Sequence, residues 1–244
     1  MKRLNQTEKK IIEILKQDPV KNVNLINFIR FNPVQTIISD NGGVLVRGVS
    51  YHNWVYISCY TPEQLMILLE YLNDCDTYYA IIESWMIPYI IKDKEIKWKL
   101  TCNRLFLPES TPLPQLSSKI VPIRYKDADY IFNNYSYCGY VSLKYIRERI
   151  KQGFALGIYH EKKPIAWIMT HDDGAMGCIN VLPQYRRQGL GLDLTIALAN
   201  QLRDKSEKVF VHIEESKTES MALANKLGFI HDREVSWLAF NKEN

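Results

Sequence analysis

The stretch INVLPQYRRQGLGLDLTIALANQL, residues 179–202, decides the fold class of this chain. It passes from a strand rich in β-branched residues, through a turn with two arginines and two glycines, into the apolar spacing of a helix. The glycines at 189 and 191 leave no Cβ over the first helical turn, so an anion can approach backbone N–H groups that lack a partner within the helix. Arg186 and Arg187 add full positive charge to that of the helix dipole. The segment therefore predicts a site for a pyrophosphate group.

The elements expected around this segment alternate between strands and helices. Strands are expected at 119–124, 154–159, 164–171, 176–181, 208–213, 229–231 and 235–240, and helices at 127–133, 142–152, 189–205 and 218–227. Strands interleaved with helices of this length are typical of α/β (α+β) proteins with a mixed central sheet and flanking helices.

The first part of the chain predicts a separate, smaller α/β domain. Helices are expected at 5–17, 23–30 and 61–72, and strands at 34–39, 43–49, 54–60, 78–82 and 97–107. Residues 108–118 contain three prolines and no apolar period, which indicates a linker. The expected domains are therefore 1–110 and 119–244.

Residues 119–240 resemble the GNAT superfamily of acyl-CoA-dependent N-acetyltransferases, both in the order of their elements and in the turn at 186–191. The tandem arrangement and a terminal strand that contains Trp237 are similar to the glycine N-acyltransferase-related branch. The resemblance implies the GNAT fold for this part, with the N-terminal domain interpreted as a degenerate copy. It also implies acetyl-CoA, or another acyl-CoA, as co-substrate.

The resemblance also implies which residues bind CoA. In the family, the strand equivalent to 179–181 splays from its neighbour and bonds the pantetheine amides, and the turn equivalent to 187–192 holds the pyrophosphate. Lys217 stands where the family commonly has an asparagine that contacts CoA, and a lysine can reach a phosphate. The expected CoA-binding residues are Ile179, Val181, Arg186, Arg187, Gln188, Gly189, Leu190, Gly191, Leu192 and Lys217.

Two positions depart from the family in ways that affect the chemistry. The tyrosine that protonates the leaving thiolate is replaced by Ala224, and the glutamate base of the glycine N-acyltransferase branch by Ala175. His212 aligns with a glutamate that faces the thioester in other members, and an ordinary imidazole titrates near ~6.5, which suits proton abstraction from an amine. Glu214 shares its face of the strand and is the fallback, while a buried structural role for His212 stays open. We expect the polar run 171–173 to be a solvated turn.

The resulting functional hypothesis is direct transfer of an acetyl or other acyl group from CoA to a primary amine on a small molecule or peptide. Backbone N–H groups near Val181 would stabilise the oxyanion, His212 would take the amine proton, and no metal is required. The alternative is a non-catalytic acyl-CoA-binding or regulatory module, which the alanines at 175 and 224 favour.

Composition and charge limit the classes of partner that are expected for this chain. The 244 residues are 46% hydrophobic and 24% charged, which is ordinary for a globular protein, and the net charge of +4 comes from interleaved signs. A nucleic-acid partner is therefore not expected. The longest apolar run, 85–91, is far shorter than the ~20 residues of a membrane span. Because Glu13 and Lys16 interrupt the apolar pattern near the start, that segment predicts an amphipathic helix rather than a signal peptide, and the expected location is cytoplasmic.

Overall fold

The computed structural model describes residues 2–92, 94–135 and 141–241. Contacts divide the chain into two compact units, which we call unit 1 (Met1–Arg104 with Asp232–Asn244) and unit 2 (Leu105–His231). The sequence analysis expected the division within 108–118 and assigned the last strand to the second domain. In the structure that strand, β11 (Ile230–Phe240), belongs to unit 1 from Asp232 onward. Alternation within a strand marks its buried face and does not reveal its partner, so this pairing could not be read from the sequence.

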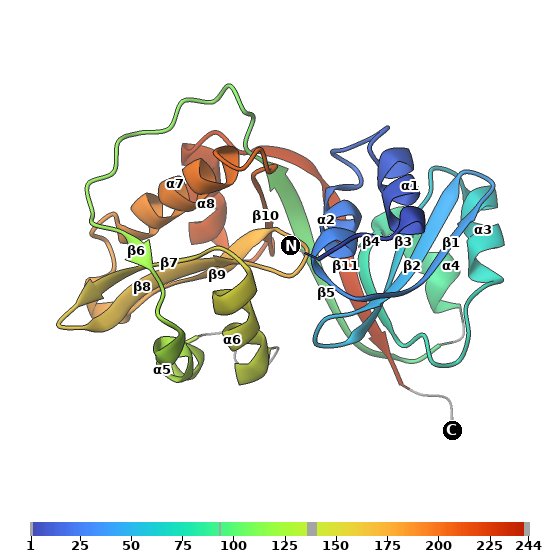
Figure 1. Cartoon of the computed structure of the whole chain (residues 1–244), viewed down its shortest axis with the longest axis horizontal. Helices are drawn as coiled ribbons and strands as arrows, with labels where there is room; N and C mark the ends of the chain where they lie inside the picture. Colours follow the sequence, from blue (N-terminus) through green and yellow to red (C-terminus); the bar gives the residue numbers. More distant parts are fainter. Residues whose placement is uncertain (1, 93, 136–140, 242–244) are drawn as a thin grey trace. The chain divides into compact units, whose positions relative to one another are not determined.

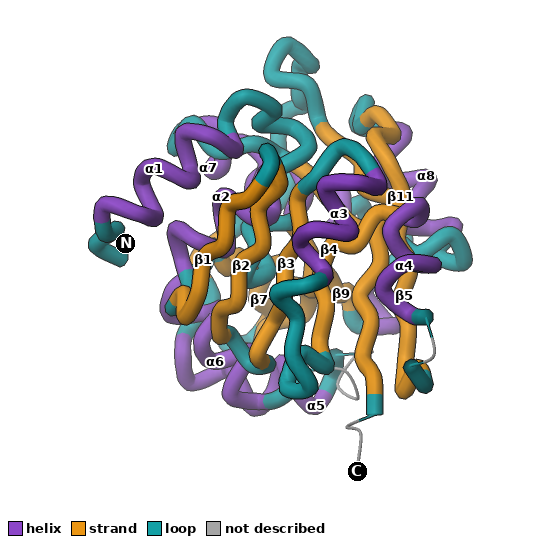
Figure 2. Tube along the Cα trace, turned by 90° about the vertical axis from the view of Figure 1, so that its right-hand side faces the viewer, coloured by secondary structure: helices purple, strands orange, loops and turns teal. Residues whose placement is uncertain are grey.

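Unit 1 is an α/β layer structure around a mixed sheet. Its elements are α1 (Gln6–Leu15), α2 (Val23–Phe31), β1 (Val34–Asp40), β2 (Gly43–Val49), β3 (Asn53–Ser58), α3 (Pro62–Leu69), β4 (Tyr78–Glu83), η1 (Ser84–Met86), α4 (Ile87–Ile91), β5 (Ile96–Phe106) and β11. The strand order is β1-β2-β3-β4-β11-β5, and Figure 2 shows these strands side by side. The strands expected at 34–39, 43–49 and 54–60 are confirmed and form an antiparallel meander, and β3 then pairs with β4 in parallel.

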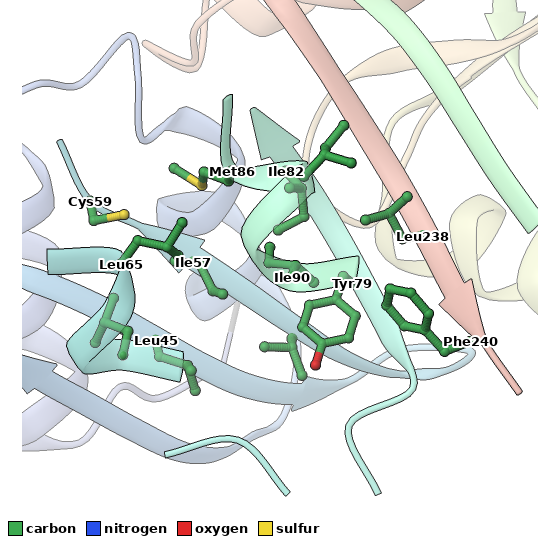
Figure 3. Packing of buried hydrophobic residues seen from close by; sticks show 13 residues of the cluster. Leu45, Ile57, Cys59, Leu65, Tyr79, Ile82, Met86, Ile90, Leu238 and Phe240 are labelled. Atoms are coloured by element: carbon green, nitrogen blue, oxygen red, sulfur yellow. The ribbon is translucent and has the colours of Figure 1, made fainter. Parts of the chain in front are cut away.

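Both faces of this sheet are buried at β2 and β3, which explains why these two strands are apolar at consecutive positions. Leu45, Val55 and Ile57 pack in one cluster with residues of α3 and α4, and Figure 3 shows this cluster together with its members from β4 and β11. The alternate residues Val46 and Trp54 pack in a second cluster with α1 and α2. The two-residue period of β2 and β3 therefore separates two cores.

A buried arginine ties β11 into unit 1. The side chain of Arg104 on β5 is 0% exposed, and its Nε and Nη2 donate to Asp232 Oδ2 at 2.9 and 2.6 Å. Its Nη1 donates to Asn24 Oδ1 at 2.7 Å and to the carbonyl of Lys21 at 3.1 Å. Each of these bonds neutralises or solvates the buried cation, so replacing Arg104 removes all of them at once.

We expect Arg104→Leu to destabilise the protein by roughly 3 kcal/mol. This value is at the lower end of the range for breaking a buried ion pair, because Arg233 still binds Asp232 in the variant. The matched control is Arg147→Leu, which breaks an exposed ion pair with Asp129 and should cost less than ~1 kcal/mol. Denaturant unfolding of both variants measures the difference. Equal losses would contradict the structural role given to Arg104.

Unit 2 carries the segment that the sequence singled out. Its elements are β6 (Val121–Pro122), η2 (Tyr125–Asp127), α5 (Ala128–Asn133), α6 (Leu143–Gln152), β7 (Ala155–His160), β8 (Lys163–Thr170), β9 (Met176–Val181), η3 (Pro183–Tyr185), α7 (Leu190–Arg203), β10 (Phe210–Ile213) and α8 (Thr218–Lys226). Their strand order is β10-β9-β8-β7-β6, with α7 and α8 on one face and α5 and α6 on the other (Figure 1). The strand expected at 119–124 is reduced to β6, after which the N–H of Ile123 donates once more to β7, to the carbonyl of Ala155 at 3.0 Å, before η2 begins at Tyr125.

One order of elements occurs twice along the chain: two helices, three antiparallel strands, a helix, a strand parallel to the third, another helix and a long strand. The long strand is β5 the first time and β11, which belongs mainly to unit 1, the second time, and β6 precedes the helices of the second set. Thus β3, α3 and β4 of unit 1 correspond to β9, α7 and β10 of unit 2. The α/β fold class and its mixed sheet are confirmed. Among the residues described, no helix is long and apolar enough to cross a membrane.

Candidate functional site

The third strand of unit 2 changes course in the middle. β9 pairs with β8 in an antiparallel ladder whose register shifts between Trp167 and Met169, and Cys178 on β9 has a positive φ of 49°. A non-glycine residue in this region, next to a register shift, marks a β-bulge. On its other edge, β9 pairs in parallel with β10 at one position of the described chain, where Met176 lies opposite Val211. The backbone after Met176 is therefore the place where the two parallel strands can separate.

The turn that follows β9 has the conformation that an anion site needs. Gly189 is the N-cap of α7 with a φ of 80°, and Arg187 has a φ of 63°. No side chain caps the helix, and a Cβ on Gly189 would meet nothing within 4 Å. Glycine is thus required here by its backbone angle rather than by crowding, and the space before the helix is open. The first N–H groups of α7, which lack helical partners, face this space together with the positive end of the helix dipole.

Most of the predicted CoA-binding residues come together in this one connection. A Cβ on Gly191 would lie 3.8 Å from both Ile179 Cδ1 and Val181 Cγ2, so these side chains pack against the first turn of α7. Arg186 is exposed and its Nε donates to the carbonyl of Val181 at 3.1 Å. Arg187, Gln188 and Gly189 are exposed, and Leu190, Gly191 and Leu192 are half-buried. Lys217 comes from a different connection, since it precedes α8 after β10.

A carboxylate that the sequence analysis did not single out secures the start of α7. Asp193, in the first turn, is buried and accepts from Ser117 Oγ at 2.9 Å. The acid is therefore bound to the segment before β6 instead of capping the helix. Its place in the first turn of a helix is the signal that could have drawn attention to it.

The corresponding turn in unit 1 is closed on itself. Thr61 caps α3 by accepting from the N–H of Gln64 at 3.3 Å, and Pro62 at the first position has no N–H. The side chain of Gln64 in turn accepts from the N–H of Tyr60 at 2.8 Å. In unit 1 the start of α3 is thus occupied by nearby side chains of the same unit, whereas in unit 2 the start of α7 is open. The candidate site is therefore in unit 2.

The candidate proton acceptor lies on β10, the strand that pairs in parallel with β9. His212 is half-buried on β10, with its ring centroid 5.6 Å from that of Phe210 in an edge-on arrangement. Glu214, the fallback, follows the end of the strand and is half-buried. Ala224 on α8 and Ala175 before β9 are both buried, so the two positions that carry acid and base in the family hold only methyl groups.

A polar cluster on the α6 face of β9 corrects one expectation. Residues 171–173 were expected to be solvated, yet Asp172 is 8% and Asp173 3% exposed. His171 Nδ1 lies 2.8 Å from the Tyr145 hydroxyl, which donates to Asp172 Oδ1 at 3.3 Å. Cys178 Sγ lies 4.0 Å from the same His171 nitrogen. The expectation was wrong because α6 covers the turn, which local polarity cannot show.

Charge in this cluster shifts the pKa of both ring and thiol. Burial by itself lowers the pKa of His171, but the charge of Cys178 and its hydrogen bond, followed by Asp173 and Asp172, raise it to about 9. Burial raises the pKa of Cys178, and the positive charge of His171 and its hydrogen bond outweigh burial and lower it. The arrangement therefore favours a thiolate beside an imidazolium.

Comparison with known proteins agrees with this architecture. Residues 155–238 match the family model described as FR47-like protein. Solved structures with the same fold include that of a Drosophila protein, with 18% identity, a TM-score of 0.81, and coverage of 100% of this chain and 99% of that one. A GCN5-related N-acetyltransferase from Kribbella flavida matches with 12% identity and a TM-score of 0.60, over 90% of this chain and 94% of its own.

A third solved structure shows the doubled arrangement. It is described as a tandem GNAT protein from the clavulanic acid biosynthesis pathway, and it matches with 15% identity and a TM-score of 0.54, over 98% of this chain and 96% of its own. No curated protein matches the chain. The chain therefore has the GNAT fold, and its residues 155–238 carry the FR47-like match within that fold.

Proposed function

We propose that this protein transfers an acetyl or other acyl group from acyl-CoA to a primary amine, and that unit 2 carries the reaction. One observation supports the proposal above all others. The edge of β9 leaves its parallel partner after Met176 and leads directly to a helix whose N-terminus is open at Gly189. An extended amide chain and a pyrophosphate, joined as they are in CoA, fit these two features in that order.

Binding would use the backbone of β9 and the positive charge of the turn. The pantetheine amides would bond to the main chain at Ile179 and Val181, and the pyrophosphate would take the N–H groups of 189–192. Arg186 now donates to the carbonyl of Val181. If pantetheine takes that carbonyl, the guanidinium is released toward the phosphates, so one side chain can serve both the free and the bound state.

The chemistry would be direct attack of a neutral amine on the thioester carbonyl. Backbone N–H groups of β9 would stabilise the negative oxygen, and His212 would take the proton that the amine releases, with Glu214 as the fallback. Because Ala224 has no hydroxyl to donate, the CoA thiolate would leave as the anion or take its proton from water. None of these steps requires a metal ion.

The alternative function is a non-catalytic acyl-CoA-binding or regulatory module. The buried methyl groups of Ala175 and Ala224, where the family has a base and an acid, favour it. Both functions share the binding site, so binding of CoA alone does not separate them.

Turnover against a panel of amines tests the proposal. Acetyl-CoA and the full chain are mixed with amino acids, polyamines, aromatic amines and peptide N-termini, and free CoA thiol is followed together with the mass of the amide product. We expect amine-dependent thiol release with at least one class. Binding of CoA without amide formation from any amine would contradict the enzymatic function and support the binding module.

A further inference from the structure

The pair formed by Cys178 and His171 has the parts of an activated nucleophile. A thiol lies 4.0 Å from an imidazole nitrogen, and the imidazole is held by a third group, the Tyr145 hydroxyl at 2.8 Å. One edge of the ring lies against Gly177 of β9, where a Cβ would come within 2.2 Å of His171 Nε2. The thiol and the Tyr145 hydroxyl share Nδ1 of His171, and a thiol beside an imidazole nitrogen is the pair that activates cysteine in enzymes. Cys178 is buried, only 3% exposed, and His171 is half-buried.

Polar or charged side chains from three segments face the pair. From α6 come Tyr145 and Arg149, from the turn before β9 come Asp172 and Asp173, and Tyr135 approaches from the end of α5. Arg149 is 4% exposed, its guanidinium lies 5.6 Å from the Tyr145 ring centroid, and its Nε has no hydrogen-bond partner within the described chain. The positive charge of this buried guanidinium favours the thiolate form of Cys178 and lowers its pKa.

The pair lies on the strand that the proposed function assigns to acyl-CoA. Cys178 immediately precedes Ile179, and the bulge at Cys178 marks where β9 departs from its regular ladder. Ile179 and Val181 pack toward α7, whereas Cys178 faces His171 and Tyr145 on the α6 side. A thioester bound along the edge of β9 would therefore place its carbonyl beside Cys178. Solvent scarcely reaches the side chain of this residue.

We propose that Cys178 is an acylation site, and that in the absence of an amine it takes the acyl group from bound acyl-CoA. The Cys178 thiolate attacks the thioester carbonyl, a new carbon–sulfur bond forms, and the bond to the CoA sulfur breaks. The CoA thiolate leaves and takes the proton of the His171 imidazolium, so that one thioester replaces another and His171 ends neutral. This inference rests on the proposed function, because it needs acyl-CoA on β9, and it makes the thiol a competitor of the amine.

Acid-quenched mass spectrometry tests the inference. The full chain is incubated with acetyl-CoA at pH 7 without amine, quenched in acid, digested and mapped, and the expected product is an acetyl group on Cys178 that hydroxylamine removes. Cys75, which is exposed, is the matched control: it should react with iodoacetamide but stay free of acetyl. His171→Asn should slow acetylation of Cys178 by at least about tenfold and make its rate rise with pH like that of an ordinary thiol.

Further variants separate failure of the inference from failure of the proposed function. Cys178→Ser and Cys178→Ala should both lose the hydroxylamine-sensitive acetyl group while keeping a native melting curve and the thermal shift with CoA. A wild-type protein that binds CoA and acetylates amines, but carries no acetyl on Cys178, overturns the inference alone. Equal acetylation of Cys75 and Cys178 also overturns it, because that result shows nonspecific transfer. Absence of CoA binding overturns the proposed function as well.

Discussion

Gly189→Glu is expected to abolish binding of CoA. In the wild-type protein, CoA at a hundredfold excess over its dissociation constant should raise the free energy of unfolding by about 2.7 kcal/mol, and this gain should vanish in the variant. Two effects add. The φ of 80° strains any residue with a Cβ, and the new carboxylate would point its charge into the space where the pyrophosphate is expected. Thermal scans with and without CoA measure the shift.

Two controls separate charge from strain and from helix electrostatics. Gly189→Ala has the strain without the charge, so it should lose about 1 kcal/mol of stability and keep a reduced shift with CoA. Asn200→Glu places the same charge on an exposed position of α7, about 16 Å along the helix, and should keep the full shift. An undiminished CoA shift in Gly189→Glu would remove the phosphate site from this turn.

His212→Ala is expected to reduce turnover by about 10²–10⁴-fold with saturating acyl-CoA and a good amine. The variant should stay slow even at a pH where the amine itself is neutral, because no side chain then takes the proton that the amine releases. Binding of acetyl-CoA should change little, because the side chain lies on β10 rather than in the turn before α7. Steady-state kinetics across pH, with binding measured separately, tests the assignment.

Loss of packing could imitate loss of a base, since His212 meets the edge of Phe210. His212→Gln fills much of the same space without an imidazole, so it should restore the melting curve and leave turnover low. Glu214→Gln tests the fallback in the same assay. A stable His212→Gln protein with wild-type turnover and pH profile would transfer the role to Glu214, to water or to the substrate.

The elements that depend on local pattern could be predicted from the sequence. The strand, turn and helix of residues 176–203 are found where expected, because β-branched residues, Gly189 and the apolar spacing of α7 all act within a few residues. The same holds for the meander of β1 to β3 in unit 1. The resemblance supplied the roles of these residues, and the open helix start at Gly189 gives those roles a physical basis.

What the sequence could not show depends on contacts between distant segments. The place of β11 between β4 and β5, and the bond of Arg104 to Asp232, join residues more than a hundred positions apart. The turn at 171–173 has the composition of a solvated loop, and only the packing of α6 over it buries Asp172 and Asp173. The bulge at Cys178 carries a positive φ on a residue type that gives no local signal for it.

Hydrogen exchange of the full chain with and without CoA tests the central claim most directly, because it locates the ligand on the backbone. The account predicts that CoA protects the amides of β9 from Ile179 to Val181 and those of residues 187–192. It also predicts no change in residues 58–64 of unit 1, where Thr61 and Pro62 already close the corresponding helix start. Protection confined to residues 58–64, or unchanged exchange at both turns under conditions where CoA is bound, would contradict it.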